Sequence, residues 1–183
     1  MAMILPKVGR GCVAALLVTL GLAGCVDSAA PLLGGAQPTF GPSVRIHGYS
    51  LTDGRASGPE VGNFRWDGAQ YRVVGRPTFD VATFTAVPFG GGNDLIVQTR
   101  SSRPQVKRIE YALARKLAEG VYLLAAIDEA DADEATRAKF CVKSAASSCR
   151  LESSEALLAF ARATAAKPDS KGSLAVIVGG RGR

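Results

Sequence analysis

The alternation of β-branched or aromatic residues with polar residues, which begins near Val44, is the feature that most constrains the fold of this chain. A period of two residues is typical of strands that bury one face. The clearest turn within this region is Asp67-Gly68, which separates Phe64-Arg65-Trp66 from Tyr71-Arg72-Val73-Val74. Alternation on both sides of an Asp-Gly pair predicts a β-hairpin.

A second predicted hairpin surrounds the run Gly90-Gly91-Gly92-Asn93. A strand is expected over Thr83–Phe89 before this run, and another over Asp94–Gln98 after it. Glycine-rich loops also cradle phosphates, but here no Gly-Lys-Ser/Thr ending and no helix start follow. A turn between two strands is therefore the preferred interpretation.

Residues 105–128 fit two different patterns. Val106, Ile109, Leu113 and Leu117 share one helical face, and the segment is rich in helix-forming residues. Ile109, Tyr111 and Leu113 also alternate as in a strand. Ala118-Glu119-Gly120 would then turn into a second strand at 121–127. The strand-rich first half favours the hairpin, and the helix remains the alternative for residues 105–119.

The last third of the chain predicts one helix and one closing strand. Ser153 or Ser154 is a suitable N-cap for a helix that places Leu157 and Phe160 at core spacing. The apolar run Leu174–Val178 predicts a buried strand. We therefore expect a single α+β domain over 44–178, mainly an antiparallel β meander with a C-terminal helix packed on the sheet, followed by a frayed basic tail over 179–183.

The N-terminus has the layout of an export signal. Lys7 and Arg10 precede an apolar run from Val13 to Ala23, which is too short for a transmembrane helix. The run ends in Leu22-Ala23-Gly24-Cys25, which resembles the lipobox of bacterial lipoprotein signal peptides. The Tyr-Ala-Leu…Gly-Val-Tyr region around residue 120 also loosely resembles hairpins of small envelope lipoproteins.

The lipobox resemblance implies that residues 1–24 are cleaved and that Cys25 receives a diacylglycerol and a further acyl chain. Several chains anchor a protein firmly to a membrane. Val26 follows the cysteine in place of the aspartate that retains such proteins in the inner membrane, so the resemblance favours the periplasmic face of the outer membrane. The Ala-, Gly-, Pro- and Ser-rich residues 25–43 are predicted to be a flexible tether.

The charge of the remaining chain is mild. Removing Lys7 and Arg10 leaves (22 − 2) − 16 = +4. This balance, together with export, excludes nucleic acid as an expected partner. A mild positive excess is compatible with an envelope protein or polyanion partner, or with an ordinary solvated surface.

Two cysteines remain once Cys12 leaves with the signal peptide and Cys25 takes the lipid. Cys141 and Cys149 enclose a short Ser/Ala-rich loop in a protein expected in an oxidising compartment. We predict that they form a disulfide. The spacing is not Cys-x-x-Cys, which argues against redox catalysis.

No catalytic, cofactor or metal site is predicted. The single histidine beyond the signal peptide, His47, lies near Ser50, but the sequence has no Gly-x-Ser-x-Gly motif. We expect His47 to be an ordinary, partly exposed side chain without a catalytic role. The acidic run Asp128–Glu134 lacks the ligands and glycine of an EF-hand and is better explained as helix-terminal acids.

The expected function is that of a non-enzymatic binding or structural module of the cell envelope. The alternative is a periplasmic binder of a small apolar ligand, or an inhibitor of an exported enzyme. Aromatic side chains would line such a ligand pocket, although core packing is their commoner role. The residues concerned are Trp66, Tyr71, Phe79, Phe84 and Phe89.

Overall fold

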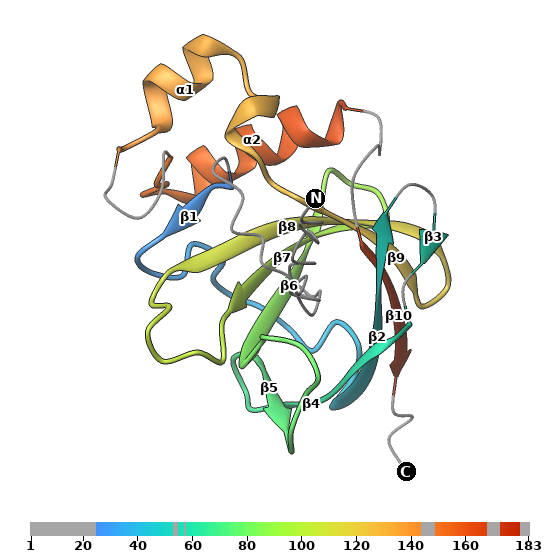
Figure 1. Ribbon diagram of the computed structural model, residues 1–183. Helices are drawn as coiled ribbons and strands as arrows, with labels where there is room; N and C mark the ends of the chain where they lie inside the picture. Colours follow the sequence, from blue (N-terminus) through green and yellow to red (C-terminus); the bar gives the residue numbers. More distant parts are fainter. Residues whose placement is uncertain (1–24, 53–54, 57, 144–148, 168–172, 180–183) are drawn as a thin grey trace, which may run out of the picture.

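The computed structural model describes residues 25–52, 55–56, 58–143, 149–167 and 173–179 (Figure 1). The predicted signal peptide and the tail beyond Gly179 lie outside the described residues. So does the centre of the loop between Cys141 and Cys149.

Within the described residues, eight antiparallel strands form a closed barrel (Figure 1). Each strand pairs with the next along the chain, and β10 pairs with both β9 and β2, which closes the ring. The strands are β2 (Ser43–Thr52), β4 (Glu60–Trp66), β5 (Tyr71–Val74), β6 (Thr83–Phe89), β7 (Asp94–Arg100), β8 (Ile109–Ala118), β9 (Val121–Ala126) and β10 (Ser173–Gly179). Two short strands, β1 (Asp27–Ser28) and β3 (Arg55–Ala56), pair with β8 and β2.

The predicted α+β class is therefore wrong. The fold is mainly β, and its helical part consists of the 3₁₀ turn η1 (Glu129–Asp131), α1 (Glu134–Phe140) and α2 (Ser154–Ala165) among the described residues. The sheet closes into a barrel because β10 pairs with β2, where Val178 lies opposite Arg45. This pairing removes both free edges of the sheet, and it joins residues more than a hundred positions apart, beyond the reach of local patterns.

The predicted hairpins are present. Asp67-Gly68 lies in the turn between β4 and β5, and residues 109–126 form the β8–β9 hairpin, so the helical alternative for this segment is excluded. Gly120 is required in this hairpin: it has φ +69°, and a Cβ there would lie 2.7 Å from the Ile177 carbonyl oxygen.

Aromatic and aliphatic side chains fill the barrel interior. Phe64, Tyr71 and Phe84 are buried together, with the Phe64 and Phe84 rings edge to face at 5.0 Å. Tyr122 and Leu95 continue this packing along the interior. An eight-stranded barrel is just wide enough for side chains to fill it or for one small ligand. Here side chains take up the space.

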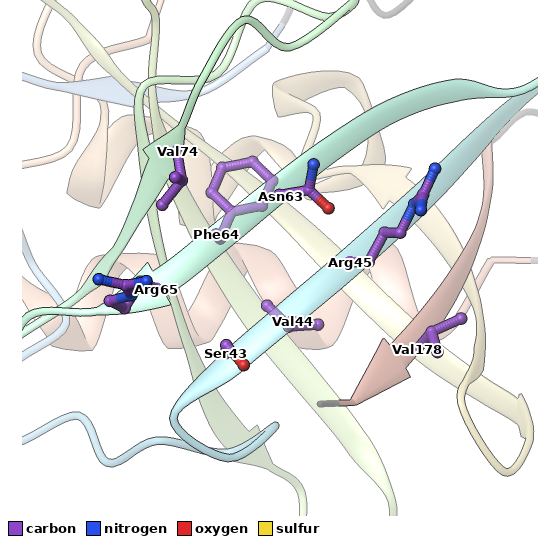
Figure 2. Close-up of a pocket in the computed structure, with 8 residues that line it drawn as sticks. All are labelled: Ser43, Val44, Arg45, Asn63, Phe64, Arg65, Val74 and Val178. Carbon is purple, nitrogen blue, oxygen red and sulfur yellow. The ribbon is translucent and has the colours of Figure 1, made fainter. Parts of the chain in front are cut away.

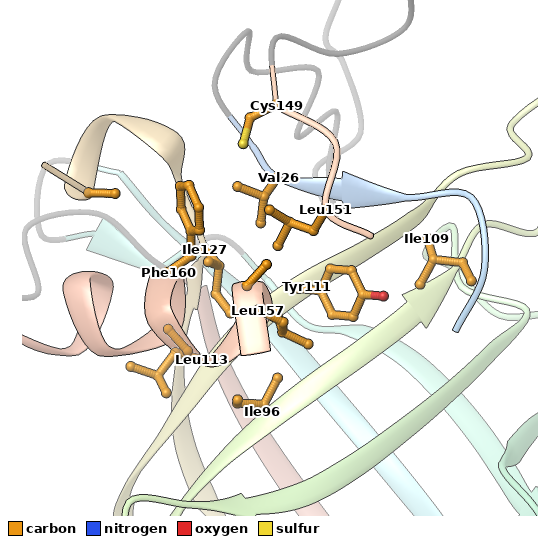
Figure 3. Packing of buried hydrophobic residues seen from close by; sticks show 13 residues of the cluster. Val26, Ile96, Ile109, Tyr111, Leu113, Ile127, Cys149, Leu151, Leu157 and Phe160 are labelled. Atoms are coloured by element: carbon orange, nitrogen blue, oxygen red, sulfur yellow. The ribbon is translucent and has the colours of Figure 1, made fainter. Parts of the chain in front are cut away.

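The outer face of β7 and β8 carries a second core beneath α2 (Figure 3). The predicted helix is confirmed: Ser153 caps it by accepting a hydrogen bond from the Ala156 amide, and Leu157 and Phe160 are fully buried. Ile96 and Leu113 of the strands pack against them. Consequently, apolar residues of β7 and β8 are buried on both faces.

The predicted flexible tether over residues 25–43 is also corrected by the structure. Val26 is fully buried, and its amide donates to the Ile127 carbonyl at 3.1 Å. The amides of Leu32 and Leu33 donate to the Gln98 side-chain oxygen at 3.0 and 3.2 Å. The few apolar residues of this segment are therefore anchors on the domain, although their spacing has no period.

Candidate functional site

A shallow groove of about 280 Å³ lies on the outer face of β10, β2, β4 and β5 (Figure 2). We call it the basic groove. Its lining residues are Ser43, Val44, Arg45, Asn63, Phe64, Arg65, Val74 and Val178. This face lies away from α2, which covers the outside of the barrel at β7 and β8.

Strand register places four side chains of the groove in one row. Val178 of β10 pairs with Arg45 of β2, Arg45 with Asn63 of β4, and Asn63 with Val74 of β5. Directly paired residues project from the same face of an antiparallel sheet. The two valines are 51% and 48% exposed and are among the most exposed large apolar residues of the described chain.

The charge of the groove is positive. Arg45 and Arg65 are exposed, and neither has a carboxylate partner within the described part of the chain. Arg72, which lies opposite Arg65, is paired with Asp67 at 2.9 Å. No acidic residue lines the groove among the described residues. Two guanidinium groups beside exposed valines suit a partner that combines negative charge with apolar surface.

Asp67 stays ionised at the end of the groove. The backbone amides of Gln70 and Ala69 donate to its carboxylate at 3.0 Å and lower its pKa below the usual value, and the Arg72 guanidinium acts in the same direction. Its charge is therefore already engaged within the β4–β5 turn, where it compensates Arg72 and leaves Arg45 and Arg65 uncompensated.

An apolar row adjoins the groove on the same outer face. Two residues along β10, β2 and β4 from the first row, a second row of directly paired residues crosses the sheet. It consists of the half-buried Val121, Val176, His47 and Val61. Apolar surface with arginine at its margin is a common composition of protein-binding sites. The groove and this row together form a continuous face that the described elements leave uncovered.

Cys25 lies at the other end of the strands, beyond the end of β9. It forms an isolated bridge with Asp128, and its thiol is partly buried. Burial, together with the negative charges of Asp128 and Glu110, raises the pKa of the Cys25 thiol to about 11. In the folded chain this thiol is protonated and is a poor nucleophile at neutral pH.

The predicted disulfide between Cys141 and Cys149 is present, with a Cα–Cα distance of 4.7 Å. It joins the end of α1 to the segment that leads into α2, and Cys149 is fully buried. A Glu129 carboxylate oxygen lies within 4.8 Å of both sulfur atoms. The sulfurs are bonded to each other, so they are not the thiolates that a metal ion requires.

The other predicted residues do not converge on a site. His47 lies between Val61 and Val176, and within the described residues its imidazole makes no hydrogen bond to a serine or a carboxylate. The aromatic residues that were candidates for a ligand pocket pack in the cores instead. Trp66, Tyr71, Phe79 and Phe84 belong to the interior cluster, and Phe89 packs against the cluster beneath α2.

No local pattern in the sequence predicts the basic groove. Arg45, Arg65 and Val178 are ordinary members of separate strands, and only strand register brings them together. One indication is present in the sequence: Leu174–Val178 is apolar at every position, so the outward-facing residues of β10 are apolar too.

Comparison with protein-family models, with curated proteins and with solved structures finds no match. The helices in the described part of the chain are too short or too polar to cross a membrane.

Proposed function

We propose that this protein is a lipid-anchored component of the bacterial cell envelope that acts as a non-enzymatic binding module, with the basic groove as its binding face. The observation that carries the proposal is the uncovered row Val178–Arg45–Asn63–Val74, together with the uncompensated Arg65 beside it. Its partner is an envelope molecule that presents negative charge next to apolar surface.

The anchor is supported by the basic and apolar layout of residues 1–24 and by the lipobox-like Leu22–Cys25. The raised pKa of the Cys25 thiol adds a constraint on timing. Transfer of the diacylglycerol group needs an accessible and reactive thiol, and the Cys25 thiol is partly buried in the fold, so we expect the modification to precede folding of the domain around it. This order agrees with modification during export, with attachment at the outer membrane as the expected destination.

Binding on the outside of the barrel is preferred over capture of a small apolar ligand inside it. The Phe40 ring lies 6.0 Å from Tyr71, 6.3 Å from Phe84 and 5.9 Å from Tyr122. These four rings fill the space that an internal ligand would need.

A non-enzymatic role is supported by the setting of the candidate groups. His47 has valines as its register neighbours, and the two remaining thiols are bonded. Histidine is the most frequent acid–base group and cysteine a common nucleophile, and both act only when they are accessible and suitably paired. His47 lies beside the basic groove and is not one of its lining residues, so replacing it with Ala is expected to leave the cellular function intact.

The test uses a photo-crosslinking amino acid at Val178 of the full-length protein in cells. We expect a discrete adduct that disappears when Arg45→Glu and Arg65→Glu are combined. Arg162→Glu, on the exposed side of α2, is the matched charge reversal and should leave the adduct unchanged. An adduct that survives the combined groove variant contradicts the proposal. So does an adduct that forms equally well when the crosslinker is placed at Leu117, which is exposed but does not line the groove.

A further inference from the structure

We infer that the barrel rests directly on the membrane with its Cys25 end and holds the basic groove away from the bilayer, facing the aqueous compartment. This inference rests on the proposed lipid anchor at Cys25. It concerns the surface that meets the lipid headgroups and the direction in which the binding face points.

The residues after Cys25 leave no flexible spacer between an acylated Cys25 and the fold. The Val26 amide donates to the Ile127 carbonyl, and the Asp27 amide donates to the Cys149 carbonyl at 3.3 Å. The Asp27 carbonyl accepts a hydrogen bond from the Leu151 amide at 2.7 Å. Asp27 is thus held between β8 on one side and residues 149–151 on the other.

Side-chain contacts reinforce this attachment. The buried Asp27 carboxylate pairs with Arg150 at 3.4 Å. The Ser28 hydroxyl hydrogen-bonds the Tyr111 hydroxyl at 2.6 Å, and both residues are buried. Acyl chains on Cys25 would therefore fix the orientation of the barrel as well as its location.

Exposed apolar and basic side chains lie beside Cys25, where they can meet lipid headgroups. Arg150 is bridged to Asp27 on one side and to Val142 on the other. Neighbouring strands lie about 4.8 Å apart, so Val142 lies roughly 10 Å from Asp27. Val142 is 44% exposed, and Lys143 follows it with no carboxylate partner among the described residues.

Lys139, on the last turn of α1, adds a second cation to this end. Its ion pair with Glu155 at 3.2 Å is largely exposed on both sides and contributes little stability, so the ammonium group can turn to a phosphate. Acidic residues lie at this end as well and keep their charge: Asp128 accepts from the Ala130 amide and Asp133 from the Thr136 amide. The cations therefore offset only part of this negative charge, and the orientation rests on the close attachment of Cys25 to the barrel.

The basic groove lies at the opposite end of the same strands. Val121 of β9 pairs with Val176 of β10 and serves as the reference point. Asp128, the bridge partner of Cys25, lies seven residues from it toward one end of the barrel. Val178 lies two residues from Val176 toward the opposite end. At about 3.3 Å per residue these nine steps span roughly 25–30 Å along the strands. Figure 1 shows the same separation, with β1 and α1 at one end of the barrel and the ends of β4 and β10 at the other.

The experiment measures how close two positions lie to the bilayer. Full-length acylated protein is purified from cells and reconstituted into phosphatidylethanolamine–phosphatidylglycerol vesicles. A spin label is placed at Lys139→Cys or at Arg65→Cys; because Cys25 is acylated and the other two cysteines are bonded, the introduced thiol is the one that reacts. Relaxation by a nickel chelate attached to lipid headgroups then reports proximity.

We expect strong relaxation at position 139 and little at position 65. A flexible Gly/Ser insertion of about 12 residues between Cys25 and Val26, which adds roughly 20 Å of reach, should weaken the relaxation at position 139. Equal relaxation at both positions, or no effect of the insertion, overturns the fixed orientation and leaves the anchor intact. Protein that carries no acyl chain and does not float with the vesicles overturns the anchor itself.

Discussion

The Phe40 amide donates a hydrogen bond to the Tyr71 hydroxyl at 2.8 Å, and that hydroxyl donates to the Gly41 carbonyl at 2.9 Å. The two rings lie 6.0 Å apart. Tyr71 is fully buried in the barrel, so this contact joins the segment before β2 to the interior core. Residues 25–43 therefore belong to the folded domain.

Phe40→Ala should destabilise the protein by roughly 2–4 kcal/mol, because it removes a half-buried ring from between three others and leaves a cavity. Chemical denaturation followed by intrinsic fluorescence measures the change. Leu117→Ala, at a side chain that is 55% exposed, is the control and should stay within about 0.5 kcal/mol of wild type. An unchanged stability of Phe40→Ala would mean that the segment is detached from the barrel in solution.

Gly62→Ala should be destabilising by roughly 1–3 kcal/mol. A Cβ at position 62 would lie 2.8 Å from the Phe64 ring and would overlap the Phe79 ring, which stacks on Phe64. Gly34→Ala is the matched control, because nothing lies within 4 Å of its Cβ position. Thermal unfolding of both variants makes the comparison, and equal unfolding temperatures would contradict this packing of Phe79.

The disulfide should contribute roughly 2–3 kcal/mol, as expected for a ring that closes a sequence separation of 8. Replacing both Cys141 and Cys149 with Ser tests this without leaving one thiol unpaired. Denaturation of wild type under reducing conditions should give a similar loss. If protein taken from the envelope alkylates at both positions without reduction, the bond is absent there.

The Cys25 thiol should react slowly in folded protein that has not been acylated. A shift of its pKa from 9.0 to about 11 lowers the thiolate fraction at neutral pH by about 100-fold. Because the pKa is raised, the alkylation rate should keep increasing until the pH passes about 11. Asp128→Asn removes one of the causes and should accelerate the reaction, whereas a rate equal to that of the unfolded chain would contradict the partly buried position.

Local patterns predict the hairpins of this fold well. Asp67-Gly68 and Gly120 mark turns whose chemistry is visible in the sequence, and Ser153 marks the start of α2. Barrel closure depends on the pairing of β10 with β2, which no local pattern encodes. The proposed binding face depends on the same pairing, because Val178 meets Arg45 only once the ring is closed.

The prediction of a flexible tether over residues 25–43 was wrong for a different reason. Its composition is that of a linker, yet Val26, Leu32 and Phe40 each find a place in a core that other parts of the chain supply. Composition describes the average tendency of a segment, whereas a few apolar residues at the right positions decide whether it docks. The structure therefore moves the proposed anchor from the end of a tether to the surface of the barrel.

Metabolic labelling with a radioactive fatty acid tests the central claim most directly. Cells that produce the full-length protein should incorporate label into it, and the labelled protein should fractionate with the membranes. Cys25→Ser should remain unlabelled and keep residues 1–24, since the lipobox resemblance makes processing depend on this thiol. Wild-type protein that is soluble and unlabelled would contradict the account of a lipid-anchored envelope module.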